Sequence, residues 1–579
     1  MTKCRTLVLC LLACFATASV VSAQQGPVIL QPVFQGESPP LTDLLADLAS
    51  NMTARDHAGT AEFYDIPNQE VDLLQGKAAA EFASGEDPVR QSSVWRKSQP
   101  TGSLSLPELS FEGNTNADNA ALLGVLPAPP DVEGDVGKDY YAQMNNVVSE
   151  IFHKSDGSSA SGPFPNNIFF AGTGSFCEAT NSGDPIVLYD HEDQRWIFSQ
   201  FAIFDPDGKS YQCFAVSKTR DPLGAYYLYQ YEVATPIQAG GAALNDYEKI
   251  TVWHDGLYYT HNEFQFGPTS GIGVAAIAFD KDAMYDGESD AVAVKFSLTP
   301  DATGFPFYLL PSHWEGNKKP KNGAPNIFFQ AVDRPIFGGP GVGDGFRQWA
   351  FSADFENPAN STFTELPFIE TPDFNLVIPC GRNCFDQPSP GTVAEGNGLD
   401  DIGLRAMFRV QWRSFGRYDS ALLNMTVNAD GNGLGGVRWT ELRDYGNGFE
   451  LYQTGTFAPS DGNHRFMGSI AQDRKGNIAL GYSVTGLNTF PSIRYTGRTP
   501  DDPLGTMQSE IECHAGTGSQ IGAGNRWGDY STMSVDPQDD CTFWYTQEYY
   551  DATIVRDWKT RVCSFRFDTC RSGSNPGQN

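Results

Sequence analysis

The sequence predicts an all-β protein whose body is a β-propeller. From Asp131 onward, short runs rich in Tyr, Phe, Trp, Val and Ile alternate with turns rich in Gly, Asp, Asn and Pro. This pattern is typical of sandwiches, barrels and propellers. A repeated phrase favours the propeller, because a strand, an acidic turn and a second apolar strand begin near Asp184, Asp246, Met467 and Asp529. Sixty-two residues separate Asp184 from Asp246, and 62 separate Met467 from Asp529.

The N-terminus predicts an exported protein. Lys3 and Arg5 precede an apolar run from Leu7 to Val21, and Ser22-Ala23 supplies a small-residue end. Residues 1–23 are therefore predicted to be a signal peptide, with a membrane anchor as the alternative. We expect the mature chain to be a soluble, secreted monomer without a membrane span, and a periplasmic or cell-surface location is the alternative.

Residues 24–125 differ in composition from the rest and predict an N-terminal extension or linker. Leu41, Leu44, Leu45 and Leu48 have helical spacing, and residues 69–84 form a second short amphipathic candidate. The composition between residues 92 and 130 is that of a linker. We expect this extension to be partly helical and partly disordered, the propeller to span residues 126–571, and residues 572–579 to form a disordered tail.

The period of the repeat predicts seven blades. Arg405 lies 62 residues before Met467, and looser members of the repeat start at Asp135 and Asn326. Seven inner strands with four-stranded blades fit this spacing. A six-bladed ring and a large β-sandwich are the alternatives. The segment from Trp558 to Phe567, together with a strand near residues 106–111, could close the ring.

The cysteines predict disulfides. Cys4, Cys10 and Cys14 lie in the predicted signal peptide, and an even number remains in the mature chain. An even count in an exported chain indicates four disulfides with no free thiol. Sequence proximity favours Cys177 with Cys213 and Cys380 with Cys384, and leaves Cys513, Cys541, Cys563 and Cys570 to pair among themselves. A zinc site at Cys380 and Cys384 is the alternative, but no second Cys or His pair lies nearby.

Several phrases resemble a family of large, secreted, mostly bacterial propeller-like proteins without an established activity. They begin at Pro129 (PPDVEGDVG), Gly183 (GDPIV), Asn477 (NIALGYS), Pro491 (PSIRYTGR) and Arg526 (RWGDYS). The resemblance covers about residues 127–570 and implies a propeller outside the cell. It also implies the pairs Cys541 with Cys570 and Cys513 with Cys563. The chain resembles sialidase-type propellers more distantly, because it lacks their Ser-x-Asp-x-Gly-x-x-Trp box.

The charge and the missing motifs exclude several functions. The formal net charge is -31, so the surface repels phosphate backbones, and nucleic acid is not an expected partner. The chain contains no Gly-rich phosphate loop, no His-Glu-x-x-His zinc helix and no Gly-x-Ser-x-Gly nucleophile elbow.

Acidic residues that open inner strands are the first candidate site. In a propeller these strands line the central channel, so Asp184, Asp246 and Asp529 are predicted to face one cavity. They could act as general acid, base or nucleophile in catalysis. They could instead hold Ca²⁺, although the sequence does not identify a metal site. The structural alternative is that each carboxylate caps its own turn.

Basic residues are the second candidate site. Arg405, Arg494 and Arg526 could bind the carboxylate of an anionic sugar through bidentate hydrogen bonds. Salt bridges to the acidic ring are the alternative. His261 and Glu263 follow a Tyr pair and could reach the channel mouth, where His261 would serve as a base for polysaccharide elimination. A surface or turn role is the alternative for His261.

Two classes of function follow from these features. The first is recognition or degradation of an extracellular, anionic glycan; as an enzyme the protein would be a polysaccharide hydrolase or lyase. The second is a non-catalytic scaffold for adhesion or protein interaction, since a fold alone does not imply catalysis. Two carboxylates about 5–10 Å apart in a cleft would favour the enzyme. A channel plugged by bulky side chains would favour the scaffold.

Overall fold

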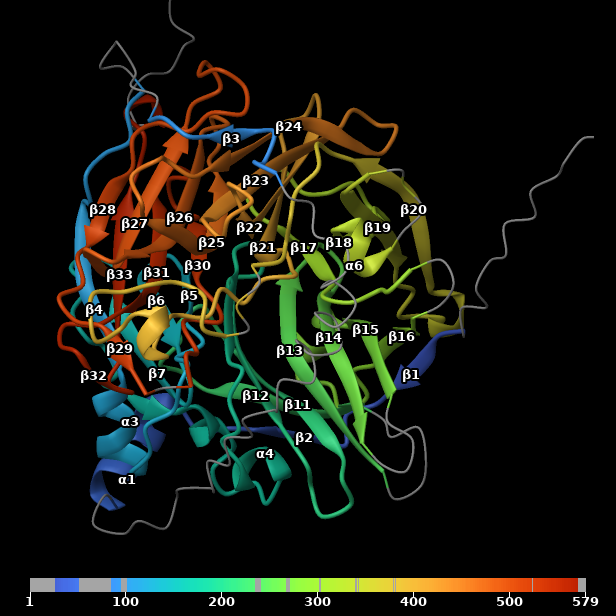
Figure 1. Cartoon of the computed structure of the whole chain (residues 1–579). Coiled ribbons are helices and arrows are strands. Elements are labelled where there is room, and N and C mark those ends of the chain that lie inside the picture. Colours follow the sequence, from blue (N-terminus) through green and yellow to red (C-terminus); the bar gives the residue numbers. More distant parts are fainter. Residues whose placement is uncertain are drawn as a thin grey trace, which may run out of the picture.

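The computed structural model describes residues 26–51, 85–94, 102–234, 241–266, 271–300, 304–338, 341, 343–378, 380, 382–522 and 524–570. The predicted signal peptide, the helix candidate at residues 69–84 and the tail at 572–579 lie outside these residues. The described part is mostly β-structure (Figure 1). No helix within it is both long and apolar enough to cross a membrane.

The body consists of antiparallel four-stranded meanders that follow one another along the chain. The first three are β5 (Glu133–Val136), β6 (Tyr140–Met144), β7 (Val148–His153) and β8 (Phe164–Pro165); β9 (Ile186–Asp190), β10 (Arg195–Ala202), β11 (Ser210–Ser217) and β12 (Tyr226–Ala234); β13 (Ala242–Val252), β14 (Leu257–Phe266), β15 (Gly271–Phe279) and β16 (Ala293–Leu298).

Three further meanders follow in the same order. They are β17 (Leu310–Trp314), β18 (Asn326–Val332), β19 (Gly345–Ser352) and β20 (Thr362–Glu370); β21 (Met407–Ser414), β22 (Asp419–Asn428), β23 (Gly435–Asp444) and β24 (Phe449–Phe457); β25 (His464–Gln472), β26 (Ile478–Gly486), β27 (Thr489–Arg498) and β28 (Ile511–His514). β17 also pairs in parallel with β21, so two of these meanders share one sheet.

The last meander takes its outer strand from the N-terminal side of the chain. Its strands are β30 (Thr532–Val535), β31 (Phe543–Tyr549), β33 (Lys559–Phe565) and β4 (Leu109–Thr115). β4 runs antiparallel to β33 (Figure 1). The predicted closing segments near residues 106–111 and 558–567 therefore do pair. The segment before residue 126, which the sequence analysis predicts to be a linker, therefore contains β4, a strand of the last sheet. The partner of β4 lies far away in the sequence.

The first strands of the meanders contact one another in a closed ring. β5 contacts β9, and the contacts continue through β13, β17, β21, β25 and β30 back to β5. Consecutive meanders around such a ring are the arrangement of a β-propeller. The strands are buried on both faces because each sheet packs between two neighbours. Phe214 of β11 and Phe279 of β15, for example, pack with ring centroids 4.9 Å apart.

The N-terminal segment lies along the outer edges of these sheets. β1 (Val28–Leu30) pairs antiparallel with β16, β2 (Phe34–Glu37) pairs antiparallel with β12, and β3 (Arg90–Gln91) pairs in parallel with β24. Between β2 and β3 lies the predicted helix α1 (Leu41–Asn51), in which Leu41 and Leu44 are buried. The described parts of this segment thus cover sheet edges that would otherwise expose unpaired backbone groups. We call residues 28–51 and 85–94 the N-terminal strap.

The remaining elements are short and lie in connections. They are α3 (Asn116–Leu123), α4 (Phe176–Ala179), α5 (Lys281–Asp286), α6 (Arg334–Phe337), the 3-10 turns at Asn166–Phe170, Pro358–Asn360, Val393–Glu395 and Asp568–Cys570, and the small parallel pair β29 (Gln520–Ile521) and β32 (Ile554–Val555).

Four disulfides join the described cysteines in the pairs that the sequence and the resemblance predict. They are Cys177–Cys213, Cys380–Cys384, Cys513–Cys563 and Cys541–Cys570. Cys513 of β28 and Cys563 of β33 connect two neighbouring sheets. Four disulfides are expected of a protein that folds in an oxidising compartment.

Candidate functional site

Each inner strand of the ring has a strand head, by which we mean a residue in the left-handed region of the backbone that lies two or three residues before the strand or, in β13 and β25, within it. These residues and their φ angles are Asp131 (50°), Asp184 (45°), Tyr247 (54°), Tyr308 (53°), Leu404 (71°), Met467 (53°) and Asp529 (60°). Such angles are uncommon for residues other than glycine and cost of order 1–3 kcal/mol each unless surrounding contacts hold them. Because they recur at the head of each inner strand, they mark one end of the propeller axis. We call this end the mouth.

The recurring angle corrects the register of the predicted site. Asp184 and Asp529 are strand-head residues, as the sequence predicts. For the predicted residues Asp246 and Arg405, the strand head is the adjacent residue in the sequence. It is Tyr247, directly after Asp246, and Leu404, directly before Arg405. The looser candidates are displaced further, because Asp135 lies inside β5 and Asn326 begins β18, a second strand.

Asp184 connects the heads of three sheets. Its backbone N–H donates to Oδ1 of Asn146 at 3.1 Å. Its carboxylate Oδ2 accepts from the backbone N–H of Tyr247 at 3.3 Å and from the hydroxyl of Tyr530 at 2.8 Å. The partners lie far from Asp184 in the sequence, so this carboxylate does not merely cap its own turn. Asp184 is half-buried, which leaves part of it accessible at the mouth.

Asp131 is a second carboxyl group beside Asp184. It is 3% exposed, and its backbone N–H donates to the carbonyl of Gly528 at 3.0 Å. Burial, and next the charge of Asp184, raise the pKa of Asp131 well above its usual value. Asp131 is therefore more readily protonated than an ordinary aspartate, while the neighbouring Asp184 accepts hydrogen bonds.

Lys249 lies below the mouth, among carboxylates. It is completely buried, and its ammonium nitrogen lies 3.9 Å from the ring centre of Tyr247 and 3.4 Å from that of Tyr530. Burial lowers the pKa of Lys249 to about 8, and the nearby charges of Glu133 and Glu248 oppose that shift. Lys249 is thus a buried cation that offsets the acidic groups around it.

Glu133 and Glu248 are the buried carboxyl groups next to Lys249. Neither has measurable exposure. Burial raises the pKa of Glu133 to about 7 and raises that of Glu248 well above its usual value. The hydroxyl of Thr532 donates to Glu133, and Gln212 donates to Glu248 at 3.2 Å. The groups below the mouth can therefore exchange protons near neutral pH.

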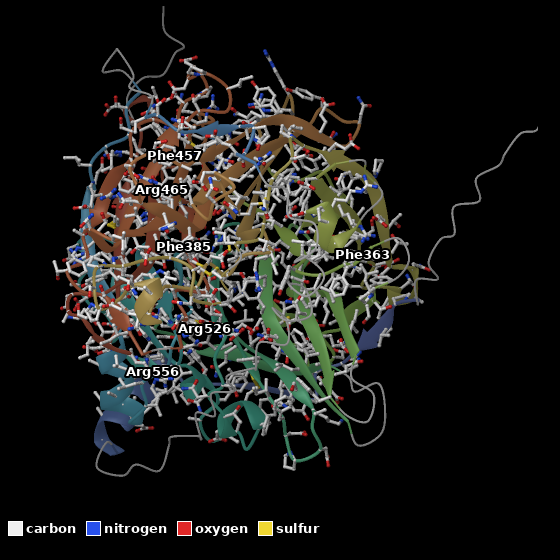
Figure 2. All side chains as sticks on the ribbon, viewed as in Figure 1. Phe363, Phe385, Phe457, Arg465, Arg526 and Arg556 are labelled. Atoms are coloured by element: carbon white, nitrogen blue, oxygen red, sulfur yellow. A yellow bond between two sulfur atoms is a disulfide. The ribbon has the colours of Figure 1, made fainter. Side chains whose placement is uncertain are left out.

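Arginines complete the mouth. Arg526 forms an ion pair with Asp529, in which Nε donates to Oδ1 at 3.2 Å. The Arg526 side chain is 21% exposed, and its charge also acts on Asp131 and Asp184. Figure 2 labels Arg526 within the body of the molecule. Arg526, Asp184 and Asp529 therefore belong to one cluster, and their role as a site stays a prediction.

Arg405 is held between aromatic rings. Its guanidinium carbon lies 4.2 Å from the ring centre of Tyr247 and 3.8 Å from that of Tyr308. The side chain is 5% exposed. Stacking on two rings orients the guanidinium, so Arg405 connects the strand heads of three neighbouring meanders. Asp246, the third predicted carboxylate, is half-buried and precedes Tyr247 in β13.

Arg494 lies away from the mouth, contrary to the prediction. It is on β27, the third strand of its meander, and its Nη1 lies 2.7 Å from Oε1 of Glu510. Glu510 also pairs with Arg465 at 2.9 Å. Arg494 is therefore part of a salt-bridge network within its own sheet, and its printed partners are not members of the predicted acidic ring.

His261 and Glu263 are also misplaced by the prediction. They lie on β14, with Nε2 of His261 3.5 Å from Oε2 of Glu263. Lys295 of β16 binds the same oxygen at 2.9 Å and donates to the carbonyl of Val233 in the preceding meander. Burial lowers the pKa of His261 to about 4. His261 is thus a buried imidazole within its own sheet and not a base at the mouth.

The sequence analysis missed Asp131, Glu133, Glu248, Lys249 and Tyr530. All five stand within three residues of a strand head, in the same repeated phrases that supplied the predicted residues. The sequence signal that could have identified these residues was therefore their position within the repeated phrase. The choice of Asp alone overlooked residues that alternate inward along the strand after the head.

Side chains fill the axis below the mouth. Arg409 of β21 is fully buried and lies 3.3 Å from Oδ2 of Asp135, 3.3 Å from Oε1 of Glu315 and 3.1 Å from Nε2 of His313. Gln411 donates to the other oxygen of Glu315. A small pocket beyond this network lies at the other end of the axis; its lining includes Tyr189, His191, Asn317 and Asp540.

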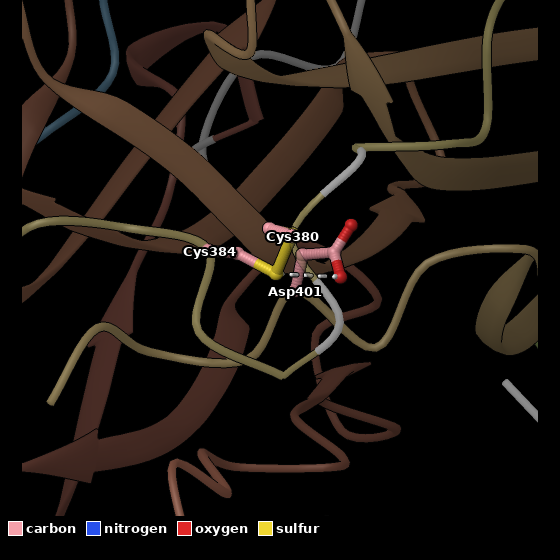
Figure 3. Close-up of side chains that lie close together, drawn as sticks. All are labelled: Cys380, Cys384 and Asp401. Atoms are coloured by element: carbon pink, nitrogen blue, oxygen red, sulfur yellow. Dashed lines mark hydrogen bonds between the residues drawn. A yellow bond between two sulfur atoms is a disulfide. The ribbon is translucent and has the colours of Figure 1, made fainter. Parts of the chain in front are cut away.

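Cys380, Cys384 and Asp401 lie close together near the mouth (Figure 3). Their ligand-type atoms are within 4.8 Å of one another, but the two sulfur atoms form a disulfide. The disulfide removes the thiolates that a zinc site would need. Burial, and next the charge of Asp400, raise the pKa of Asp401 to about 8. The Ca²⁺ site considered for the mouth stays a prediction.

We expect stability to fall as pH rises from 5 to 8. Burial raises the pKa values of Glu133 and Glu315 to about 7 and that of Asp401 to about 8. A carboxyl group with a raised folded-state pKa stabilises fully below its unfolded pKa, and this contribution disappears as pH rises through the folded pKa. Each group contributes on the order of 3 kcal/mol. Urea-unfolding midpoints at pH 5, 6.5 and 8 measure the change.

The variant Glu133→Gln serves as the control for this prediction, because it removes one titrating group and should flatten the profile. A midpoint that increases from pH 5 to pH 8 would contradict the assignment of these protons. The pKa of Glu263 is lowered to about 2 by its neighbours despite burial. Its contribution to stability therefore increases with pH, but only below about pH 4, outside the range of this experiment.

Comparison with known proteins gives distant structural likenesses. No family model and no curated protein matches the sequence. An ulvan lyase of polysaccharide lyase family 25 is 10% identical, with 79% of this chain and 93% of that one covered and a TM-score of 0.36. A Trypanosoma rangeli sialidase bound to the inhibitor DANA is 8% identical (66% and 54% covered, TM-score 0.31). Drosophila Semaphorin 1b is 9% identical (80% and 88%, TM-score 0.32). These likenesses do not identify a ligand.

Proposed function

We propose that the protein is a secreted, seven-bladed propeller that binds an extracellular glycan at its mouth. Each meander would be one blade, and the strand-head residues would form the floor of the binding site. The observation that carries the proposal is the convergence of Asp131, Asp184 and Arg526, with stacked Tyr247, from distant parts of the chain. Aromatic faces and charged hydrogen-bonding groups together are what a sugar with hydroxyl and carboxylate groups requires.

The same site is equipped for acid–base chemistry on the bound glycan. The raised pKa of Asp131 favours its protonated form, and Asp184 lies beside it as a hydrogen-bond acceptor. A protonated carboxyl group that assists the leaving oxygen, next to a second carboxylate, is the pairing used in glycoside hydrolysis. Asp131 would act as the acid, Asp184 as the base or nucleophile, and Arg526 would bind a carboxylate on the sugar.

A screen of the purified protein against anionic and neutral polysaccharides tests this function. Binding is measured by calorimetry, and cleavage by new reducing ends or unsaturated-uronate absorbance. Asp184→Asn should reduce cleavage about 100-fold or more, and Arg526→Gln should weaken binding of anionic polymers selectively. Arg566→Gln, which alters an arginine directly after β33 in the last meander, is the matched control and should match the wild type.

The filled axis favours a second candidate, a non-catalytic scaffold. Lys249, Arg409 and Gln411 have at most 1% exposure, so the described axis holds side chains in place of an open channel. A scaffold would bind through its rims and would not cleave a glycan. If no polysaccharide is bound or cleaved, and the mouth variants behave as the wild type does, the glycan proposal is wrong and the scaffold is favoured.

A further inference from the structure

We infer that an exposed aromatic cluster on the face opposite the mouth is a second contact site for an anionic polysaccharide. The cluster consists of Phe415, Tyr418, Tyr445, Tyr452 and Arg443, and we call it the aromatic platform. The inference rests on the proposed function in taking a glycan as the ligand. It adds a site that lies outside the mouth and makes no use of the mouth residues.

The topology places the platform at the far end of the blade. β21 starts at the mouth and ends at Ser414, so the turn between β21 and β22 lies at the opposite end. β22 runs back toward the mouth and β23 returns from it, which brings the turn between β23 and β24 to the same end. Residues 415–418 and 445–448 form these two turns, and Tyr452 follows on β24.

Two rings of the platform are exposed, Phe415 and Tyr418 are half-buried, and contacts within the cluster align all four. Tyr445 is 53% exposed and Tyr452 is 37% exposed, whereas large apolar side chains elsewhere on the strands are mostly buried. Phe415 stacks on Tyr418 with ring centres 5.2 Å apart and planes at 28°. Tyr418 and Tyr445 are 5.7 Å apart. Several neighbouring rings on one exposed surface provide the flat apolar faces on which sugar rings stack.

Arg443 fixes the geometry of the platform. Its guanidinium carbon lies 4.0 Å from the ring centre of Tyr418 and 3.4 Å from that of Tyr452. Its Nε donates to Oε1 of the fully buried Glu441 at 2.6 Å. The buried Glu441 therefore holds the guanidinium in place between the rings of Tyr418 and Tyr452. Such pre-organisation reduces the entropy lost when a ligand binds.

The rim of the platform is cationic in a strongly acidic protein. Lys318, Lys321 and Arg417 are exposed. A Cβ atom added to Gly416 would lie 2.5 Å from Nζ of Lys318, so this lysine lies over the turn between β21 and β22. Within the part of the chain that the structure describes, neither Lys318 nor Arg417 forms an ion pair.

Asp419 and Asp444 are half-buried acidic residues beside the platform. Oδ1 of Asp444 accepts three backbone N–H groups of its own turn, from Gly446, Asn447 and Gly448, at 2.6–2.9 Å. Burial raises the pKa of Asp419. One exposed acidic residue, Glu450, lies opposite Arg443 in the pairing of β23 with β24, and the exposed basic residues Lys318, Lys321 and Arg417 outnumber it. Together with the rings, they favour a polymer that carries carboxylate or sulfate groups over a neutral one.

Affinity electrophoresis in gels that contain polygalacturonate, heparin or dextran tests the platform. The wild-type protein should be retarded by at least one of the two anionic polymers and not by dextran. Retardation by polygalacturonate alone indicates carboxylate recognition, and retardation by heparin alone indicates sulfate recognition. The double variant Tyr445→Ala/Tyr452→Ala should bind roughly tenfold more weakly. Lys318→Gln/Arg417→Gln should lose most of the salt dependence of binding.

Leu487→Ala is the matched control, because Leu487 is 59% exposed in the turn between β26 and β27, at the mouth end of its meander. It should bind as the wild type does. All four proteins should melt at similar temperatures, since the altered side chains are exposed. Unchanged retardation of both double variants, or no retardation of the wild type by either anionic polymer, overturns the platform.

The mouth variants separate this failure from failure of the proposed function. If Asp184→Asn and Arg526→Gln abolish cleavage or binding in solution while the platform variants bind normally, the platform is wrong and the mouth proposal stands. If the platform variants lose retardation while the mouth variants do not differ from the wild type, the platform is supported and the mouth proposal is wrong.

Discussion

Replacing Lys249 with Met is expected to lower the free energy of unfolding by about 3–5 kcal/mol at pH 7. Lys249 is a fully buried cation, and Asp131, Glu133, Asp184 and Glu248 all act on its charge. Met has similar volume but no charge, so the acidic groups would repel one another without an opposing cation. Urea unfolding followed by tryptophan fluorescence measures the loss.

The pH dependence of this loss distinguishes electrostatics from packing. At pH 5 Glu133, whose pKa burial raises to about 7, is protonated in the folded protein, so Lys249 has fewer anions to offset. The cost of Lys249→Met should therefore be smaller at pH 5 than at pH 7. An equal loss at both values would indicate lost packing alone. Lys319→Met, at an exposed lysine whose side chain is 45% exposed, is the control and should change stability by less than about 1 kcal/mol.

Replacing Asp87 with Ala is expected to cost about 3–5 kcal/mol, because it leaves a buried arginine without its partner. Asp87 belongs to the N-terminal strap, and its Oδ2 accepts from Nη1 of Arg438 at 3.0 Å and from the hydroxyl of Thr456 at 2.7 Å. Arg438 has no measurable exposure. Asp87 of the strap thus offsets the positive charge of Arg438, which lies inside the body of the propeller.

The neighbouring Glu86 supplies the control for this prediction. Its side chain is 60% exposed and pairs with Arg90 at 2.9 Å, a surface ion pair of the kind that contributes less than about 1 kcal/mol. Glu86→Ala should therefore unfold at nearly the wild-type urea concentration. If Asp87→Ala does so as well, the strap does not stabilise the propeller through Arg438.

The period of the fold could be predicted because it is set by local chemistry. Four strands with their turns occupy about 62 residues. The strand heads Asp184 and Tyr247 lie 63 residues apart, and Met467 and Asp529 lie 62 residues apart. Between Tyr308 and Leu404 the interval is 96 residues, because the loop that contains the Cys380–Cys384 disulfide is inserted before β21. This insertion interrupts the regular interval on which the predicted blade count depends.

The candidate site was harder to predict because its residues depend on tertiary contacts. The left-handed angle at Tyr247 and Leu404 contradicts the preference of those residue types, so a sequence cannot place the heads to one residue. The environment of Lys249 is built by several distant strands, and nothing local to Lys249 indicates it. The strap was read as a linker because its short strands gain hydrogen bonds only at the edges of other sheets.

The closing of the last sheet by β4 sets an order of events in biosynthesis. β4 ends at Thr115 and its partner β33 begins at Lys559, so one edge strand leaves the ribosome more than 400 residues before the other. Until β33 has been made, β4 lacks its partner strand. The disulfides Cys513–Cys563 and Cys541–Cys570 cannot form before then either, because Cys563 and Cys570 have not yet been synthesised. The ring can close only after nearly the whole chain has been made. A nascent chain that stops before residue 559 would therefore leave the last sheet incomplete and would be a natural client for chaperones.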